Sequence, residues 1–170
     1  MSGVAIRRSR PEDVDFLLEL VNDDDVRPFL SPRGASDRDA LLEEIGRSAA
    51  EPGAFGRFVI EVDDEPAGST GFQIANEVSR IARLERLAVH PRFRGRRVAD
   101  EAARLLQRLL LVELGFHRLE LEIYAFNERA QAHVERAGFV REGVRRRAYL
   151  RGDEWVDSVM YGLVREDIGD

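Results

Sequence analysis

The residues best suited to chemistry lie in segment 87–97, which reads LAVHPRFRGRR. An apolar, strand-like stretch ends there at His90-Pro91, a loop with Gly95 among four arginines follows, and helical spacing begins at Val98. A loop that leads into a helix presents free N–H groups and the positive end of the helix dipole to phosphate, and glycine lets the anion approach the backbone. The segment therefore predicts phosphate binding, with a solvated, arginine-rich loop as the alternative.

Two other phosphate-binding loops are excluded by the sequence. The chain has no lysine, so it cannot form G-x-x-x-x-G-K-[ST], and no G-x-G-x-x-G follows a predicted strand. Any phosphate site must therefore use arginine side chains and backbone N–H groups.

The elements that position this loop follow from hydrophobic periodicity. Strands are expected at 4–6, 58–60, 67–74 and 81–89, and helices at 11–21, 35–50 (capped by Ser36 or Asp37) and 98–115. A strand at 119–123, a short helix from Asn127 to Gly138, and two strands joined at 151–154 complete the chain. The order βααβββαβαββ predicts one α/β domain over residues 1–170, with a mostly antiparallel sheet.

Composition excludes several classes of protein. With 44% hydrophobic and 34% charged residues the chain is typical of a globular domain, and no run reaches the ~18 apolar residues that a membrane span requires. The absence of cysteine excludes disulfides, thiolate metal sites and a cysteine nucleophile, and the three histidines share no ligand spacing, so no metal is expected. A net charge of -6 argues against nucleic acid as a partner. We expect a cytoplasmic protein.

Charge is unevenly distributed along the chain. Acids outnumber bases two to one through Glu65, whereas seven arginines and a single acid lie between Arg80 and Arg97. An acidic front suits a cationic substrate, and a basic middle suits an anionic cofactor. The run 23–25 (DDD) could receive a cationic amine or could be a solvated helix end.

These motifs resemble those of the GNAT superfamily of N-acetyltransferases. Arg92-x-x-Gly95, preceded by 88–91 (AVHP) and followed by a long amphipathic helix, resembles the acetyl-CoA motif Q/R-x-x-G-x-G/A of that family. Segments 127–130 (NERA) and 135–139 (ERAGF) resemble its N-x-x-[AS]…E-K-x-G-F landmark. The resemblance covers about residues 4–165 and is nearest to the RimJ/RimL-like branch, which acetylates N-termini of ribosomal proteins, on the evidence of Glu101-Ala102, 141–145 (REGVR) and Trp155-x-Asp157.

The resemblance implies a specific cofactor site. The sheet should be seven-stranded, flanked by about four helices, and splayed between the strand ending at Val89 and the strand 119–124, with the pantetheine arm of acetyl-CoA in the gap. The family's chemistry is direct attack of a neutral amine on the thioester, with a backbone N–H near Val89 polarising the carbonyl. The implied cofactor-binding residues are Leu87, Ala88, Val89, Arg92, Arg94, Gly95, Arg96, Arg97, Val98, Ala99 and Asn127.

Three positions depart from the family pattern. Arg97 stands where Gly or Ala is usual in the family. Val134 stands where many members carry a tyrosine that protonates the leaving thiolate, and Arg83 where many carry a glutamate that acts as the general base. These departures keep open an alternative function, a non-catalytic acyl-CoA-binding sensor or docking module.

Glu85 and Tyr149 are the catalytic candidates. Glu85 is the only acid in the strand 81–89 and is expected to share a face with Arg83, Leu87 and Val89; it could act as a general base or pair with Arg83 or Arg86. Tyr149, like Tyr124, could protonate the thiolate or only pack in its strand.

We therefore expect an N-acetyltransferase acting on a primary amine, either a protein N-terminal α-amine or a small amine, as a monomer or homodimer. The absence of a clear general base favours α-amines, because their pKa near 8 leaves more neutral amine at neutral pH than lysine at ~10.4.

Overall fold

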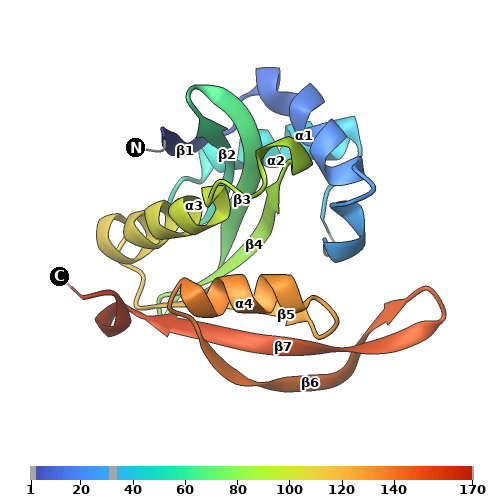
Figure 1. Cartoon of the computed structure of the whole chain (residues 1–170). Coiled ribbons are helices and arrows are strands. Elements are labelled where there is room, and N and C mark those ends of the chain that lie inside the picture. Colours follow the sequence, from blue (N-terminus) through green and yellow to red (C-terminus); the bar gives the residue numbers. More distant parts are fainter. Residues whose placement is uncertain (1–2, 31–33, 170) are drawn as a thin grey trace.

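The computed structural model describes residues 3–30 and 34–169 and contains one seven-stranded sheet in the order β1-β2-β3-β4-β5-β7-β6 (Figure 1). All neighbouring strands pair antiparallel except β4 and β5, which are parallel. The predicted α/β class and order of elements are confirmed. The strands are β1 (Val4–Arg8), β2 (Phe55–Val62), β3 (Glu65–Asn76), β4 (Ile81–Val89), β5 (Arg118–Tyr124), β6 (Val140–Arg151) and β7 (Glu154–Val164).

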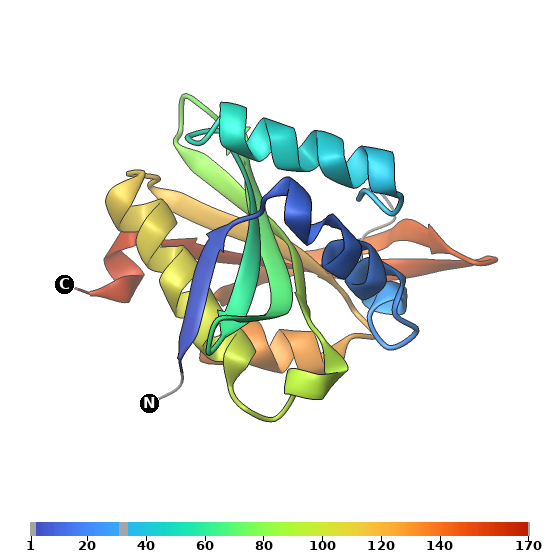
Figure 2. The same cartoon turned by 90° about the horizontal axis from the view of Figure 1, so that it is seen from above.

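Within residues 3–30 and 34–169, four α-helices flank the sheet: α1 (Val14–Asn22), α2 (Arg38–Ala50), α3 (Val98–Gln107) and α4 (Glu128–Arg136). Short 3-10 helices lie at Pro11–Asp13, Arg27–Phe29, Pro91–Phe93 and Arg165–Ile168. Helices α1 and α2 cover one face of the sheet, and α3 and α4 cover the other (Figure 2). In the described part of the chain, no helix is long and apolar enough to cross a membrane.

Two apolar layers hold these helices on the sheet. Between the sheet and α3 and α4, the buried cluster includes Phe72, Leu119 and Tyr161, each with 0% of its surface exposed. On the opposite face, Leu17 and Ile45 pack with Val59 beneath α1 and α2. Each face of the sheet is thus covered by its own pair of helices. A gap between two strands of the sheet can therefore be bordered by helices on both faces.

The helix predicted at 98–115 changes its winding near the middle. After α3 the chain continues as a π-helix over Arg108–Glu113, and the buried residues there are Leu110 and Leu111. Val112, which regular helical spacing from Val98 would turn toward the core, is 45% exposed, because the wider π turn rotates the apolar stripe. On α2, Leu41 is buried, whereas the neighbouring Leu42 is 37% exposed.

The sheet is splayed at its centre, as the resemblance implied. Strands β4 and β5 pair only where Ile81–Arg83 face Arg118–Glu120, and beyond Arg83 the two strands diverge (Figure 1). The backbone groups of β4 that face β5 in the divergent part therefore have no strand partner among the described residues.

A β-bulge in β4 changes the direction of its side chains. Gly71 of β3 faces Glu85, but Ser69, two residues away, faces Ala88, so β4 carries one extra residue there. Arg86 in the bulge has a φ of 64°. The alternation of β4 side chains between the two faces of the sheet is consequently shifted by one position.

The bulge overturns one expectation about Glu85. Ala88 packs with Leu20 of α1, whereas Val89 packs with the cluster beside α3. Glu85 therefore shares a face with Arg83 and Ala88, and the expected shared face with Leu87 and Val89 is wrong.

Candidate active site

A cavity of about 800 Å³ lies in the gap between β4 and β5. Its walls come from both faces of the sheet, because they include residues of α2 on one side and of α3 and α4 on the other. Two different molecules could thus enter from opposite faces and meet at the splay. A concave, partly apolar site of this volume is typical of small-molecule binding.

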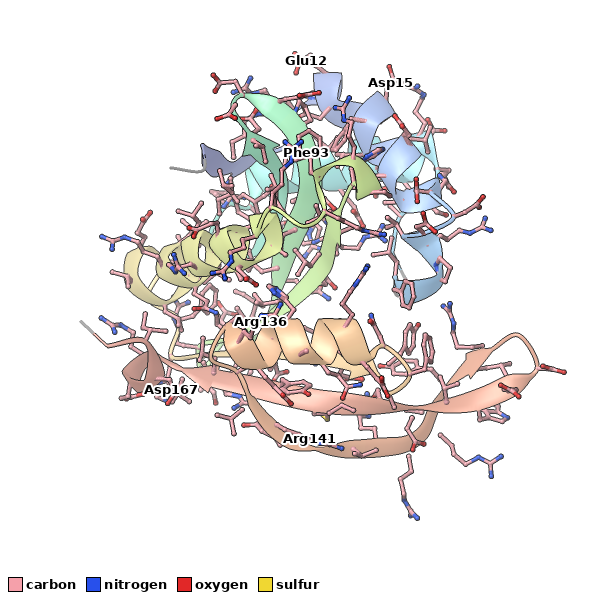
Figure 3. All side chains as sticks on the ribbon, in the orientation of Figure 1. Glu12, Asp15, Phe93, Arg136, Arg141 and Asp167 are labelled. Atoms are coloured by element: carbon pink, nitrogen blue, oxygen red, sulfur yellow. The ribbon has the colours of Figure 1, made fainter. Side chains whose placement is uncertain are left out.

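The loop from β4 to α3 follows Leu87, which lines the cavity, but the predicted cofactor-binding residues Ala88, Val89, Arg92 and 94–99 are not in the described lining. Phe93, only 4% exposed, packs with Val62, Ala67 and Val98 and anchors the loop to the sheet (Figure 3). Beyond it, Gly95 has a φ of 80°, and a Cβ added there would meet no atom within 4 Å. Phe93 therefore fixes the loop to the sheet, and the space beside Gly95 is open.

The backbone N–H groups of this loop are free to bind an anion. The Arg94 amide donates to the carbonyl of Pro91 at 3.2 Å, but those of Gly95, Arg96 and Arg97 have no acceptor among the described residues. The first N–H groups of α3, at Val98 and Ala99, have no intrahelical partner either. This arrangement suits a pyrophosphate.

The arginine side chains of the loop differ in their surroundings. Arg92 pairs with Glu65, Arg94 donates to the Asp25 carbonyl at 3.2 Å, and Arg96 lies 5.6 Å from the Phe93 ring centroid. Arg97, at the usual Gly or Ala position, is exposed and has a φ of 56°, in the left-handed region that favours glycine. Because the Arg97 side chain is exposed, it is not packed between the loop and the sheet.

Asn127 lies at the N-terminus of α4 and lines the cavity. Its Oδ1 accepts a hydrogen bond from the Ala130 amide at 3.2 Å, which confirms its predicted role as a helix cap. Asp100 connects α3 to α4, with its Oδ1 2.8 Å from Nδ1 of the buried His133 and 3.7 Å from Nη2 of Arg136. Within the described chain, no group of three or more His, Cys, Asp or Glu side chains could hold a metal ion.

Glu85 lines the cavity and pairs with an arginine that the sequence did not indicate. Its Oε1 lies 2.9 Å from Nη2 of Arg57 on β2, while Nε of the same guanidinium lies 2.9 Å from Glu44 of α2. The expected pairing of Glu85 with Arg83 or Arg86 is wrong, since Arg83 pairs with Glu120 at 3.2 Å.

Gly71 explains this unexpected partner. Arg57, Gly71 and Glu85 face one another across three strands, and a Cβ on Gly71 would lie 2.6 Å from Nη1 of Arg57. Because glycine leaves that space empty, the guanidinium crosses β3 and reaches Glu85.

Glu122 of β5 is a cavity residue that the sequence analysis did not single out. Its carboxylate accepts hydrogen bonds from Tyr149 Oη at 2.7 Å, Ser158 Oγ at 3.0 Å and Arg145 Nη1 at 2.8 Å. Burial alone would raise the pKa of Glu122, but these three donors outweigh it and hold the pKa below its ordinary value. The only signal in the sequence was the alternation of Glu120 and Glu122 with apolar residues, which indicates a strand and no site.

Tyr149, the predicted thiolate acid, also lines the cavity. Its hydroxyl donates to Glu122, and its ring meets that of Tyr124 edge-on at 5.7 Å. Tyr124 is 8% exposed, with the Arg151 guanidinium 4.9 Å from its ring centroid. The structure thus brings Glu85, Tyr149 and Asn127 to one cavity, but leaves Asp23–Asp25 outside its lining.

The splayed sheet, the free amides at the start of α3 and the cavity at the splay fit a transferase that uses an acyl-CoA. A family model described as "Acetyltransferase (GNAT) domain" matches residues 4–140. The chain belongs to the GNAT acetyltransferase family; it is an N-acetyltransferase, with acetyl-CoA as its cosubstrate.

Individual relatives agree with this assignment. The chain is 24% identical over 169 residues to the SPbeta prophage-derived uncharacterized N-acetyltransferase YokL of Bacillus subtilis (strain 168), covering 97% of this chain and 92% of that one. The spermidine N-acetyltransferase of Vibrio cholerae, solved in complex with CoA and spermine, superposes with a TM-score of 0.87 at 19% identity over 99% of both chains. A dodecameric structure of the Vibrio cholerae enzyme gives a TM-score of 0.83 at 19% identity, covering 99% of this chain and 97% of that one.

Proposed function

We propose that this enzyme transfers the acetyl group to a primary amine, which is either a small amine or a protein N-terminal α-amine. The observation that carries the proposal is the cavity at the splay, which has walls on both faces of the sheet. An acceptor that enters beside α2 can meet a thioester held beside α3 and α4.

The residues on the cofactor side fit an acyl-CoA. The free amides of residues 95–99 would hold the pyrophosphate, with Arg92, Arg94, Arg96 and Arg97 as surrounding cations. The backbone groups at Leu87, Ala88 and Val89 that face away from β3 would pair with the pantetheine amides, and Asn127 lines the cavity at the same gap. Acetyl-CoA supplies the activated thioester carbonyl.

The chemistry requires a neutral amine and a stabilised carbonyl oxygen. An N–H near Val89 would donate to that oxygen, the C–N bond would form, and the C–S bond would break to leave a thiolate that takes up a proton. Glu85 and Tyr149 both line the cavity and are the candidates for proton acceptor and proton donor. Both carry a strong hydrogen bond already, Glu85 from Arg57 and Tyr149 to Glu122.

The comparisons bear on the acceptor in one respect. Both solved structures described above are of one spermidine N-acetyltransferase, which supports a small amine over the ribosomal N-termini of the RimJ/RimL-like branch. The alternative of a non-catalytic module rests only on the departures at Arg83, Arg97 and Val134.

A paired binding and turnover experiment tests the proposal. Coenzyme A should raise the melting temperature of the wild type, because a ligand that binds only the folded state stabilises it by mass action. Gly95→Asp should abolish that shift by placing a negative charge beside the free amides. Gly95→Asn is the matched control, since asparagine has the same shape without the charge and tolerates a positive φ.

Turnover is then followed as free thiol released from acetyl-CoA with a panel of primary amines. Thiol release that depends on the amine supports the proposal. A coenzyme A shift without turnover on any primary amine would overturn the acceptor class, and the absence of a shift at millimolar coenzyme A would overturn the cofactor site as well.

A further inference from the structure

Arg86 is a partly buried cation in the cavity wall, and none of the catalytic or cofactor-binding roles described above involves it. It lies in the bulge of β4, directly before Leu87, and its Nη2 donates to the carbonyl oxygen of Ala35. Its guanidinium also packs against Gly34, where an added Cβ would overlap it. The side chain is therefore held in one place between β4 and the segment that precedes α2.

No carboxylate lies within ion-pair distance of Arg86 in the described part of the chain. Burial lowers the pKa of Arg86, and the more distant charges of Glu44 and Glu85 offset only part of this effect. Guanidinium groups removed from water are normally paired with an anion, because an unpaired buried charge is costly.

The remaining N–H groups of Arg86 reach open space. Its Nε and Nη1 have no acceptor among the described residues. No fully buried side-chain nitrogen or oxygen in the described chain lacks a hydrogen-bond partner. Those two groups must therefore be accessible to water, and Arg86 is among the residues that line the cavity.

Three of the five described carboxylates that line the cavity, in contrast, are already paired with arginines. Arg57 pairs with both Glu44 and Glu85, and Arg145 pairs with Glu122. The described residues that line the cavity include five acids and five arginines: Asp37, Glu43, Glu44, Glu85 and Glu122 against Arg47, Arg57, Arg83, Arg86 and Arg145. A polycation gains little from a wall without net charge, whereas a zwitterion matches it.

We propose that the acceptor carries a carboxylate a few bonds from its amine, as an amino acid does, and that Arg86 binds this carboxylate. The planar guanidinium presents parallel N–H donors that match a carboxylate in geometry. Since Arg86 adjoins Leu87, an anion bound to it places the neighbouring amine at the splay, on the side where Glu85 and Glu122 lie. This inference rests on the proposed transfer to a primary amine and specifies its substrate class.

Matched acceptors test the substrate class directly. For several side chains, kcat/KM is measured for the α-amino acid, its carboxamide and its decarboxylated amine, with spermidine included and all values referred to the concentration of neutral amine. We expect each preferred amino acid to exceed its carboxamide by about tenfold or more, as a charge-assisted bidentate contact would give.

Variants of Arg86 assign that preference to one side chain. Arg86→Gln should raise KM for the amino acid about ten- to a hundredfold and change kcat/KM for the carboxamide by less than about threefold. Arg86→Lys should restore part of the preference, because it retains the cation. Arg83→Gln, which removes the same charge from the same strand, should leave the ratio of acid to carboxamide unchanged. The coenzyme A melting shift verifies that each variant is folded.

Several outcomes would overturn the inference without touching the proposed function. These are a wild type that prefers carboxamides or spermidine, and an Arg86→Gln variant that loses activity equally on acid and carboxamide. If no amine is acetylated, the proposed function fails, and calorimetry of the amino acids with coenzyme A present decides this inference alone. Binding that favours the acid and is lost in Arg86→Gln supports it, and no binding overturns it.

Discussion

Replacing Tyr149 by phenylalanine should destabilise the fold through its effect on Glu122. The change removes the hydroxyl that donates to Glu122 at 2.7 Å and leaves the donors Ser158 and Arg145 in place. A hydrogen bond to a charged group contributes about 1.5–3 kcal/mol. Because two donors remain and the Glu122 side chain is 18% exposed, we expect a loss of about 1–2 kcal/mol at pH 7.

The deficit should depend on pH in a defined direction. The pKa of Glu122 in the folded state is lowered from its ordinary value of 4.5, with the donors, Tyr149 first among them, outweighing the opposing effect of burial. A lowered folded pKa contributes stability above the unfolded value, and this stability is lost as pH falls through the folded value. The difference between wild type and Tyr149→Phe should therefore be full at pH 7 and shrink below about pH 4.5.

Urea unfolding of a double-mutant cycle measures this contact. The cycle comprises wild type, Tyr149→Phe, Glu122→Gln and the double variant, and we expect a coupling energy of about 1 kcal/mol at pH 7. Tyr124→Phe is the control, because the hydroxyl of Tyr124 has only a 3.5 Å contact with Arg151. A coupling energy below about 0.3 kcal/mol would refute the contact.

The same variant tests Tyr149 as the thiolate acid. Loss of a general acid typically costs about 10²–10⁴ in rate. We expect a loss in kcat below about tenfold, since donating the proton elsewhere would leave a phenolate beside the ionised Glu122. A loss above a hundredfold with unchanged KM would establish Tyr149 as the acid.

Three further variants test the backbone and the base. Arg97→Gly should raise unfolding free energy by about 0.5–1 kcal/mol by relieving the positive φ, and an unchanged or lower Tm would contradict this. Gly71→Ala should lower it by about 1–3 kcal/mol in urea unfolding, because the new Cβ would lie 2.5 Å from the Gly56 carbonyl oxygen; full stability would refute the packing. Glu85→Gln should lower kcat/KM less than about tenfold, and a pH–rate profile showing a thousandfold defect that shrinks at high pH would instead make Glu85 the base.

The sequence by itself determined the elements, their order and the position of the glycine- and arginine-containing loop between β4 and α3. Strand β4 runs over Ile81–Val89, as predicted, and the caps of α2 and α4 are the predicted Asp37 and Asn127, each accepting a hydrogen bond from an amide three residues on. Periodicity and capping are local interactions, so the types and spacing of neighbouring residues are sufficient to specify them.

Only the tertiary structure decided which side chains meet in the cavity. The bulge at Arg86 reverses the faces of β4 beyond it, and Gly71 allows Arg57 to reach Glu85 across a strand. Tyr149 and Glu122 come from different strands, 27 residues apart in the chain. Such pairs depend on strand register. A single extra residue in one strand reverses the face of the sheet to which every later side chain points, and the periodicity of one strand alone does not specify where that residue lies.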